Sequence, residues 1–440
     1  MKGIKLEEIK KYNESFDGNF KRRLMQNVLK TTPIDVSVRI SDKEKDTQHN
    51  FEVDIETMSA PHQHASGRCW IFAGTNVLRE IVKNKCNLDN FELSQSFISF
   101  YDRFEKANYL LEAIIELKDV KHDDRTLARL LDIGVQDGGQ WDMFVNVVKK
   151  YGVCPKSVYN ETFQSNNSRQ MNSVINILIR RFAAFVSHNK DDIELIRKEK
   201  EKLIASIYEF MCTCLGKPVE KFDFEYVNKD KKYNLVQDLT PKEFFDKYIG
   251  CDLDEYVSVI NAPTKDKPYY NVFTVKYLGN VVGGKDIKYL NLLIDDFKDL
   301  CVKQLKDGQI TWFGCDCGKF ASKQDGVWDN ESYDYLGAFD FDLKVSKEDM
   351  LDYYVSSMDH AMVLTGVSFK NGKVTKWKVE NSWGTDHANK GYYLMSDSWF
   401  DSFVYQAVIN KKYLSDEMKK ALDKKIIELE PWDPMGTLAK

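Results

Sequence analysis

The stretch QHASGRCWIFA, residues 63–73, carries the strongest structural and chemical signal in this 440-residue chain. From Cys69 to about residue 85, apolar side chains recur with the spacing of one helix face, which predicts a helix that begins at or just before Cys69. Gly67 marks the turn into that helix. The N-terminus of a helix has unpaired backbone N–H groups and the positive end of the helix dipole, and both favour a thiolate. The stretch therefore predicts that Cys69 is a nucleophile.

Gln63 lies six residues before Cys69, across the predicted turn. Attack of a thiolate on a carbonyl carbon creates an oxyanion, which needs hydrogen-bond donors. The backbone N–H of Cys69 and a side-chain N–H of Gln63 can supply two donors, each typically worth ~3 kcal/mol of transition-state stabilisation. His62 and His64 flank Gln63 and could suggest a metal site, but the sequence offers no third ligand, so we expect none.

Asn371-Gly372, between two apolar runs, is the strongest hairpin signal in the chain. With a two-residue loop, opposed residues have numbers that sum to 743, so His360 faces Trp383 and lies diagonal to Asn381 on the same face. This arrangement predicts His360 as the base, Asn381 as the amide that orients its ring, and Trp383 as a supporting shield from water. A one-residue bulge would separate His360 from Asn381, so the prediction requires unbroken register.

The predicted base also bears on the predicted nucleophile. An imidazolium of His360 beside the Cys69 thiol would lower the thiol pKa from roughly 8.5 to about 4. The helix dipole alone would lower it far less. We therefore expect a Cys69–His360 ion pair.

These motifs, in this order, resemble those of the papain superfamily: Gln63-x5-Cys69-Trp70, a histidine that opens a strand, and Asn381-Ser382-Trp383-Gly384. Gly138 and Gly139 resemble the cleft glycines of that superfamily, whose backbone pairs with an extended substrate. The resemblance implies an α+β fold in which a helical subdomain faces an antiparallel, β-barrel-like subdomain. It also implies peptide hydrolysis through a thioester, with no metal or organic cofactor.

His360 follows Cys69 by 291 residues, against ~130–150 in papain-type enzymes, so about 150 residues are inserted. The motifs SGRCWIFA, GGQWDMF, ENSWG and EPWDPMG together resemble the bleomycin hydrolase and aminopeptidase C family along nearly the whole chain. This resemblance implies a cytosolic homohexamer whose active sites face an inner chamber. It further implies that a C-terminal arm lies in each cleft.

The arm implies action on peptides with a free N-terminus. A chain-terminal carboxylate fixed in the cleft would pair with the ammonium of a substrate's first residue and exclude any residue before it. The arm ends Leu438-Ala439-Lys440, so Lys440 would carry that carboxylate and bind substrate. Two alternatives remain open: a chamber that binds nucleic acid, and acyl transfer to an amine through the same thioester.

Patterns along the chain predict five segments. They are an N-terminal arm (1–60), a papain-like helical subdomain with the nucleophile (61–165), a large, mainly helical insertion (166–265), a β-rich subdomain with the histidine and asparagine (266–414), and a C-terminal helix with a cleft-filling arm (415–440). Within them, alternating apolar residues at 34, 36, 38 and 40 predict a strand. Residues 217–270 are charge-rich and predict irregular structure. A last helix is expected at 415–428, followed by an extended arm because of two prolines.

Composition limits the function classes. The 63 basic and 68 acidic residues give a net charge of -5, so no global field favours nucleic acid or anionic lipid. No run approaches the ~20 apolar residues that span a bilayer, and the start of the chain lacks the apolar core of a signal peptide. Nine cysteines, an odd number, predict reduced thiols. We therefore expect a soluble cytoplasmic protein with no membrane and no nucleic-acid partner. Peptide substrates are what the family resemblance implies.

Overall fold

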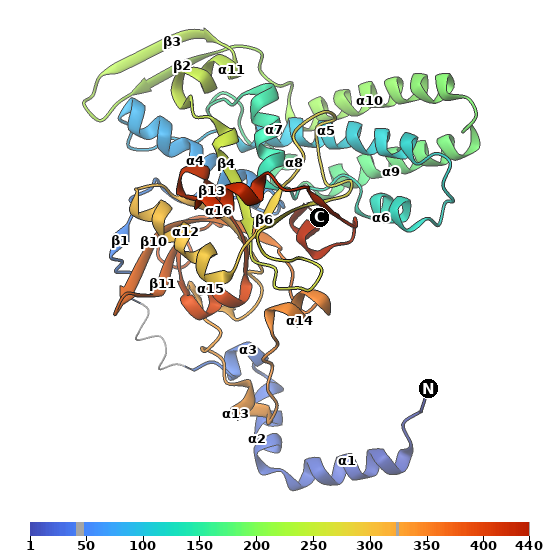
Figure 1. Ribbon diagram of the computed structural model, residues 1–440, viewed down its shortest axis with the longest axis vertical. Coiled ribbons are helices and arrows are strands. Elements are labelled where there is room, and N and C mark those ends of the chain that lie inside the picture. Colours follow the sequence, from blue (N-terminus) through green and yellow to red (C-terminus); the bar gives the residue numbers. More distant parts are fainter. Residues whose placement is uncertain (41–47, 323–324, 440) are drawn as a thin grey trace.

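The computed structural model describes residues 1–40, 48–322 and 325–439 of the chain. Helices fill the upper and right-hand parts of the molecule, a large sheet lies at its centre, and a helical arm extends below (Figure 1). The chain is therefore α+β, as predicted. The boundaries of the five predicted segments remain a prediction.

The first group of helices comprises α4 (Cys69–Cys86), α5 (Gln95–Glu116), α6 (Arg125–Ile133) and α7 (Trp141–Tyr151). α4 begins at Cys69, as the apolar spacing predicted. The side chain of Ser94 accepts a hydrogen bond from the N–H of Phe97 and caps α5, because a serine oxygen can satisfy a donor that has no partner within the helix.

The segment predicted to be an insertion contains two long helices, α9 (Arg169–His188) and α10 (Ile193–Leu215), after the short α8 (Phe163–Asn166). α9 and α10 pack against α5 through a separate apolar cluster. In Figure 1 these helices lie side by side at the right of the molecule.

The expectation of irregular structure over residues 217–270 was wrong. This segment contains a hairpin of β2 (Phe222–Val227) and β3 (Tyr233–Leu239), then α11 (Pro241–Phe244) and a π-helical turn at Phe245–Ile249. Phe222 and Phe224 are buried between charged neighbours and pack against Phe244, the first with a tilted ring and the second edge to face. Alternation of apolar and charged residues hid a half-buried strand behind a high charge content.

The large sheet contains twelve strands among the described residues, in the order β14-β5-β6-β4-β13-β7-β10-β11-β12-β9-β8, with β1 added beside β10. The strands are β1 (Val53–Asp54), β4 (Tyr256–Ile260), β5 (Asn271–Val275), β6 (Tyr289–Asn291), β7 (Thr311–Cys315), β8 (Ala321–Ser322), β9 (Val327–Trp328), β10 (His360–Lys370), β11 (Lys373–Glu380), β12 (Tyr392–Ser396), β13 (Val404–Asn410) and β14 (Ile427–Leu429). Most pairs are antiparallel, but β4–β6, β12–β9 and β14–β5 are parallel.

Helices also accompany this sheet. They are α12 (Ile294–Lys306), α13 (Tyr335–Phe339), α14 (Lys347–Asp352), α15 (Asp397–Phe403) and α16 (Asp416–Leu422). α12 lies against β7, β10 and β13, and α15 lies against β11 and β12. The β-rich character predicted for residues 266–414 is correct for the strands, but the prediction missed α12.

The β10–β11 hairpin has the predicted loop. Its register shifts twice, because each strand has one extra residue. Lys370 pairs with Lys373 as predicted, Thr375 is extra on β11, and Thr365 is extra on β10. The two bulges cancel, so Val363 pairs with Glu380 in the predicted register at the end of the ladder. The prediction required a ribbon without bulges, and the ribbon has two. The residues at its far end nevertheless keep the predicted alignment.

The neighbouring strand β1 explains the position of the second bulge, at Thr365. β1 runs beside β10 at this point, and the N–H of Ile55 donates to the carbonyl of Thr365 at 2.8 Å. A Cβ on Gly366 would lie 2.7 Å from the carbonyl oxygen of Val53, so only glycine allows this approach.

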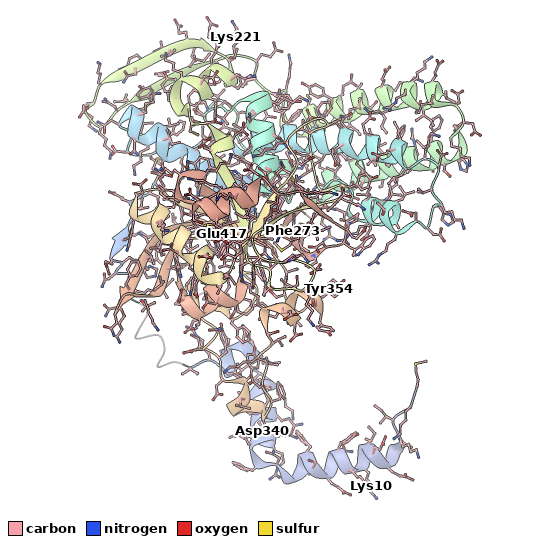
Figure 2. All side chains as sticks on the ribbon, in the orientation of Figure 1. Lys10, Lys221, Phe273, Asp340, Tyr354 and Glu417 are labelled. Carbon is pink, nitrogen blue, oxygen red and sulfur yellow. The ribbon has the colours of Figure 1, made fainter. Side chains whose placement is uncertain are left out.

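The N-terminal arm consists of α1 (Leu6–Gly18), α2 (Phe20–Leu29) and α3 (Ile34–Ser37). The predicted strand over residues 34–40 was wrong: Pro33 starts a single helical turn, and the hydroxyl of Ser37 donates back to the Pro33 carbonyl. The arm projects from the body, with Lys10 near its end and Asp340 of the sheet region beside α2 (Figure 2).

The C-terminal segment also differs from expectation. α16 ends at Leu422 rather than 428, because the chain turns to add β14 to the sheet. The final residues are not extended but form a 3-10 helix at Pro434–Ala439, with Met435 and Leu438 buried. Lys440 lies outside the described residues.

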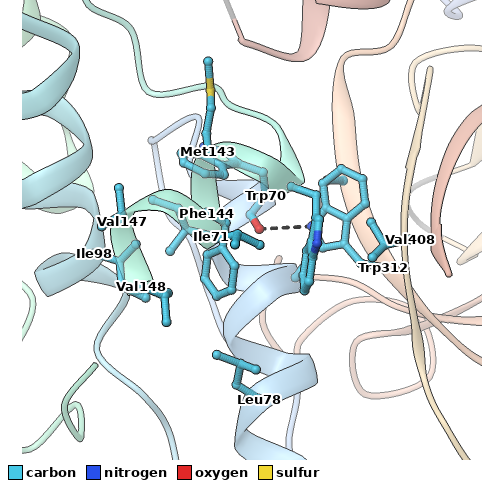
Figure 3. Packing of buried hydrophobic residues seen from close by; sticks show 14 of the residues in the cluster. Trp70, Ile71, Leu78, Ile98, Met143, Phe144, Val147, Val148, Trp312 and Val408 are labelled. Atoms are coloured by element: carbon cyan, nitrogen blue, oxygen red, sulfur yellow. Dashed lines mark hydrogen bonds between the residues drawn. The ribbon is translucent and has the colours of Figure 1, made fainter. Parts of the chain in front are cut away.

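One apolar cluster joins the helices to the sheet. It contains Trp70 of α4, Phe144 of α7 and Trp312 of β7 (Figure 3). The indole N–H of Trp312 donates to the carbonyl of Trp70 at 3.1 Å. The residue after Cys69 is therefore fixed to both parts of the molecule.

Candidate active site

Cys69, the first residue of α4, lies where the helices meet the sheet. Backbone N–H groups, including that of Ala361, lie near enough to the Cys69 thiol to favour its ionised form, and the residue is 4% exposed. Ala361 follows His360 on β10. The structure therefore brings the predicted nucleophile against the strand end that carries the predicted base.

The electrostatics of Cys69 differ from the expectation for a helix terminus. Burial raises the pKa of the Cys69 thiol to about 12, because loss of water disfavours the charged form. Backbone N–H groups oppose this rise, and the negative charge of Asp359 adds to it. The helix terminus therefore does not ionise the thiol, and formation of a thiolate requires a neighbouring group that accepts the proton.

His360, Asn381 and Trp383 lie together, as the hairpin register predicted. His360 Nε2 lies 2.8 Å from Asn381 Oδ1, and the rings of His360 and Trp383 stack with centroids 5.1 Å apart. Asn381 Oδ1 also accepts the N–H of Ser382 at 2.7 Å. Because both contacts meet the carbonyl oxygen, His360 Nε2 carries the hydrogen, and Nδ1 is left to exchange a proton with a thiol.

Gln63 is held on both ends of its amide. Its Oε1 accepts the hydroxyl of Ser382 at 2.6 Å, and its Nε2 donates to the carbonyl of Ser66 at 2.6 Å. The oxygen contact fixes which end is the donor, and an amide nitrogen has a second hydrogen. Among the described residues no second acceptor lies at hydrogen-bond distance from Nε2. Gln63 can therefore donate to a ligand oxygen.

The sequence analysis assigned no role to Ser382. It contacts both Asn381 and Gln63, and its backbone carbonyl accepts the N–H of Gln63 at 2.8 Å. The position next to Asn381 was the one available signal, but nothing local predicts a partner 319 residues away. Ser382 links the base side of the site to the oxyanion side.

A buried ionic network holds the turn before Cys69. Asp137 accepts the N–H of Gly67 at 3.0 Å and a guanidinium N–H of Arg103 at 2.5 Å, with further bonds from Ser168 and Asn172. These partners hold the pKa of the Asp137 carboxyl well below its usual range despite burial. The network was missed, although charged residues within the apolar helix 95–116 were a signal.

Gly138 and Gly139, the predicted cleft glycines, follow this aspartate. The ammonium of Lys106 donates to the carbonyl of Gly138, and a Cβ on Gly139 would lie 2.5 Å from the ring of Trp70. The indole N–H of Trp70 in turn donates to the carbonyl of Asp137 at 2.7 Å. The glycines therefore lie directly over the residue that follows Cys69.

A second buried ion pair ties α4 to the strand before Asn381. Arg79 donates to Glu380 at 2.6 Å, and Asn76 donates to the same oxygen at 2.8 Å. Both charged side chains are fully buried. Burial raises the pKa of Glu380, and the charge of Arg79 opposes that rise. This pair fixes the distance between the helix of Cys69 and the ribbon of Asn381.

The C-terminal segment contacts both sides of the site. Gln140, next to Gly139, donates to the carbonyl of Met435 at 3.4 Å, and the hydroxyl of Thr437 donates to the carbonyl of Met358 at 2.7 Å. Met358 lies two residues before His360. The last described residues therefore bridge the helices and the sheet beside the site.

His62 and His64 stack with ring centroids 4.1 Å apart. Burial and the neighbouring His64 lower the pKa of His62. Within residues 1–40, 48–322 and 325–439, no group of three or more His, Cys, Asp or Glu side chains could hold a metal ion. Over the same residues, no helix is both long and apolar enough to cross a bilayer.

Comparison with known proteins extends these observations. The model of the Peptidase C1-like family matches residues 3–436. The chain is 43% identical to aminopeptidase C of Lactobacillus delbrueckii subsp. lactis over 97% of each chain, and 38% identical to human bleomycin hydrolase over 89% of each. The crystal structure of pepW from Lactobacillus rhamnosis covers 99% of both chains with 42% identity and a TM-score of 0.96. The chain belongs to the Peptidase C1-like family.

Proposed function

We infer that this protein is a cysteine aminopeptidase that releases N-terminal residues from peptides through a thioester on Cys69. The observation that carries the inference is the position of the Cys69 thiol near the backbone of Ala361, the residue that follows His360, while Asn381 and Trp383 hold the His360 ring. The names of the relatives support the same activity. They give no support to nucleic-acid binding or to acyl transfer.

The geometry supports a two-stage reaction. His360 takes the proton of the Cys69 thiol, and the sulfur attacks the peptide carbonyl carbon to form a C–S bond. The oxyanion accepts hydrogen bonds from the backbone N–H of Cys69 and from Gln63. The C–N bond then breaks as His360 returns its proton to the leaving amine.

The thioester is then cleaved by water. His360 removes a proton from the water as its oxygen bonds to the carbonyl carbon, and the C–S bond breaks. The proton returns to the sulfur–imidazole pair, so the resting state is restored without a cofactor. Asn381 keeps the imidazole in one tautomer throughout, and Trp383 shields that contact from water.

We propose that the papain-like cleft lies between the helices and the sheet and that the C-terminal arm closes one end of it. Buried Met435 and Leu438 and the Thr437 contact support an ordered arm beside the site. A terminal carboxylate on Lys440 would pair with the substrate ammonium, and Gly138 and Gly139 would pair with its backbone.

The test uses one peptide with a free N-terminus and its N-acetylated twin. Stepwise loss of residues from the free peptide alone, followed by mass spectrometry, is the expected result. Equal cleavage of both peptides would disprove aminopeptidase action but not peptidase action. Deletion of residues 438–440 should move cleavage to internal bonds, and unchanged products would disprove the role of the arm.

We also propose that the protein is a cytosolic homohexamer. The arm exposes apolar side chains that the described chain leaves uncovered: Leu6, Ile9, Tyr12, Phe20, Leu24 and Val28. Tyr353 and Tyr354 on the body are also exposed, and Tyr354 is labelled in Figure 2. All nine cysteines are free thiols, which suits a reducing compartment. Light scattering of the full chain, with Leu24→Glu as the comparison, tests whether the arm holds copies together.

A further inference from the structure

A polar cavity of about 660 Å³ adjoins the turn between Gln63 and Cys69. Its walls are the turn, the residues before the cleft glycines, and the first half of α9, and they include His64, Ala65, Ser66, Gly67, Gln136, Asp137, Arg169 and Arg180. Ala65 pairs with Asn167 in a parallel bridge, which fixes the start of α9 against the turn.

The position of the cavity determines which part of a substrate reaches it. In the proposed reaction the carbonyl oxygen under attack lies between Gln63 and the N–H of Cys69, and the turn that joins these two residues forms one wall of the cavity. Asp137 of the opposite wall precedes Gly138, which we propose to pair with the substrate backbone. The side chain of the residue whose carbonyl is attacked is therefore the part of the substrate that would lie nearest this cavity. The inference rests on the proposed aminopeptidase function, in which that residue is the N-terminal one.

The charge in the cavity is positive. Asp137 is the one acidic side chain among its walls, and it is already paired with Arg103 and three further donors. Arg180 donates to the backbone carbonyls of residues 131 and 132, which leaves its charge unneutralised. Arg169 is exposed, and within the described part of the chain no carboxylate lies at ion-pair distance from it.

We propose that Arg169 selects peptides whose N-terminal residue carries a carboxylate, glutamate or aspartate. A guanidinium presents two parallel N–H groups that match the two oxygens of a carboxylate, and Arg169 has no competing partner in the described structure. The Asp137 carboxylate does not repel such a side chain strongly, because four donors surround it.

The test is a set of fluorogenic amides of glutamate, glutamine, leucine and lysine, because glutamine has the shape of glutamate without the charge. For the unaltered enzyme, kcat/KM for glutamate should exceed that for glutamine by roughly twofold to fivefold, the range of a partly exposed ion pair. Arg169→Gln should bring this ratio to about one and leave leucine unchanged. Arg169→Glu should invert the ratio and favour lysine.

Arg181→Gln is the matched control. Arg181 is exposed on the same helix but is not part of the cavity wall, so this variant should keep the glutamate preference. A glutamate-to-glutamine ratio of one or less in the unaltered enzyme, or a ratio unmoved by Arg169→Gln, would overturn the selection by Arg169. Failure to release any of the four residues would instead overturn the aminopeptidase activity, and this inference with it.

Discussion

Charged groups fix the turn that precedes Cys69, whereas aromatic packing and strand register position His360 at the end of its ribbon. The Arg79–Glu380 pair joins this ribbon to α4 but does not contact His360. On the turn side, Asp137 receives four hydrogen bonds and pairs with Arg103 in the protein interior. On the ribbon side, His360 lies against Trp383, and its position follows from two bulges that cancel.

This difference has an energetic consequence. Loss of one partner from the ionic side leaves a buried charge unpaired, which is expensive, while loss of apolar contact on the ribbon side leaves a smaller cavity penalty. The turn side should therefore respond to substitution mainly through stability. The ribbon side should respond mainly through activity.

The largest expected effect is on activity, when a catalytic residue from either side is removed. Cys69→Ala and His360→Ala should each lower kcat by at least about 10⁴-fold, and the double variant should be no worse than either, because the two groups act as one unit. Steady-state kinetics of the three variants checks this. Additive losses would show that the two sides work independently.

Loss of the oxyanion donor should come next. Gln63→Ala should lower kcat by about 10²- to 10³-fold with little change in KM, since Gln63 donates to a charge present only in the transition state. Ser382→Ala, which frees the Gln63 amide to rotate, should have a smaller effect of the same kind. A change confined to KM in either variant would contradict this role.

Substitution on the turn side should lower the free energy of unfolding more than substitution on the ribbon side. Asp137→Asn leaves the buried guanidinium of Arg103 without its counter-charge and should lower the free energy of unfolding by roughly 3–5 kcal/mol. Urea denaturation measures the loss. Trp383→Phe on the ribbon is the matched comparison and should cost much less; equal losses would remove the contrast between the two sides.

The smallest effect concerns pH. Burial and the neighbouring Asp316 raise the pKa of Asp359 to about 6, so its carboxyl is charged above that pH and neutral below it. Its charge stabilises an imidazolium and raises the pKa of Cys69. Asp359→Asn should therefore shift the alkaline limb of kcat/KM to lower pH by less than about one unit, with little change in the acid limb. A shift in the opposite direction would contradict this assignment.

Local signals predicted the parts of the site that depend on one or two neighbouring segments. The start of α4 at Cys69 followed from helical spacing, and the alignment of His360 with Asn381 followed from one turn and strand alternation. The predicted register holds at the far end of the ribbon because an extra residue at Thr375 and another at Thr365 cancel, and the hairpin pattern alone did not predict either bulge.

Features that depend on distant partners were not predicted. Ser382 gains its role from Gln63, and Asp137 gains its partner from α5, 34 residues away. The error over residues 34–40 has the same origin, since alternation indicates a strand only where a neighbouring strand exists to pair with it. Ile34 and Val36 are exposed on a helical turn instead.

The docked C-terminal segment has a consequence for folding. Met435 and Leu438 belong to the same apolar cluster as Trp70, so the protein interior beside Cys69 is complete only when segments far apart in the sequence have met. Such contacts require closure of a long loop, and they therefore slow folding. The arrangement links formation of the catalytic site to completion of the fold.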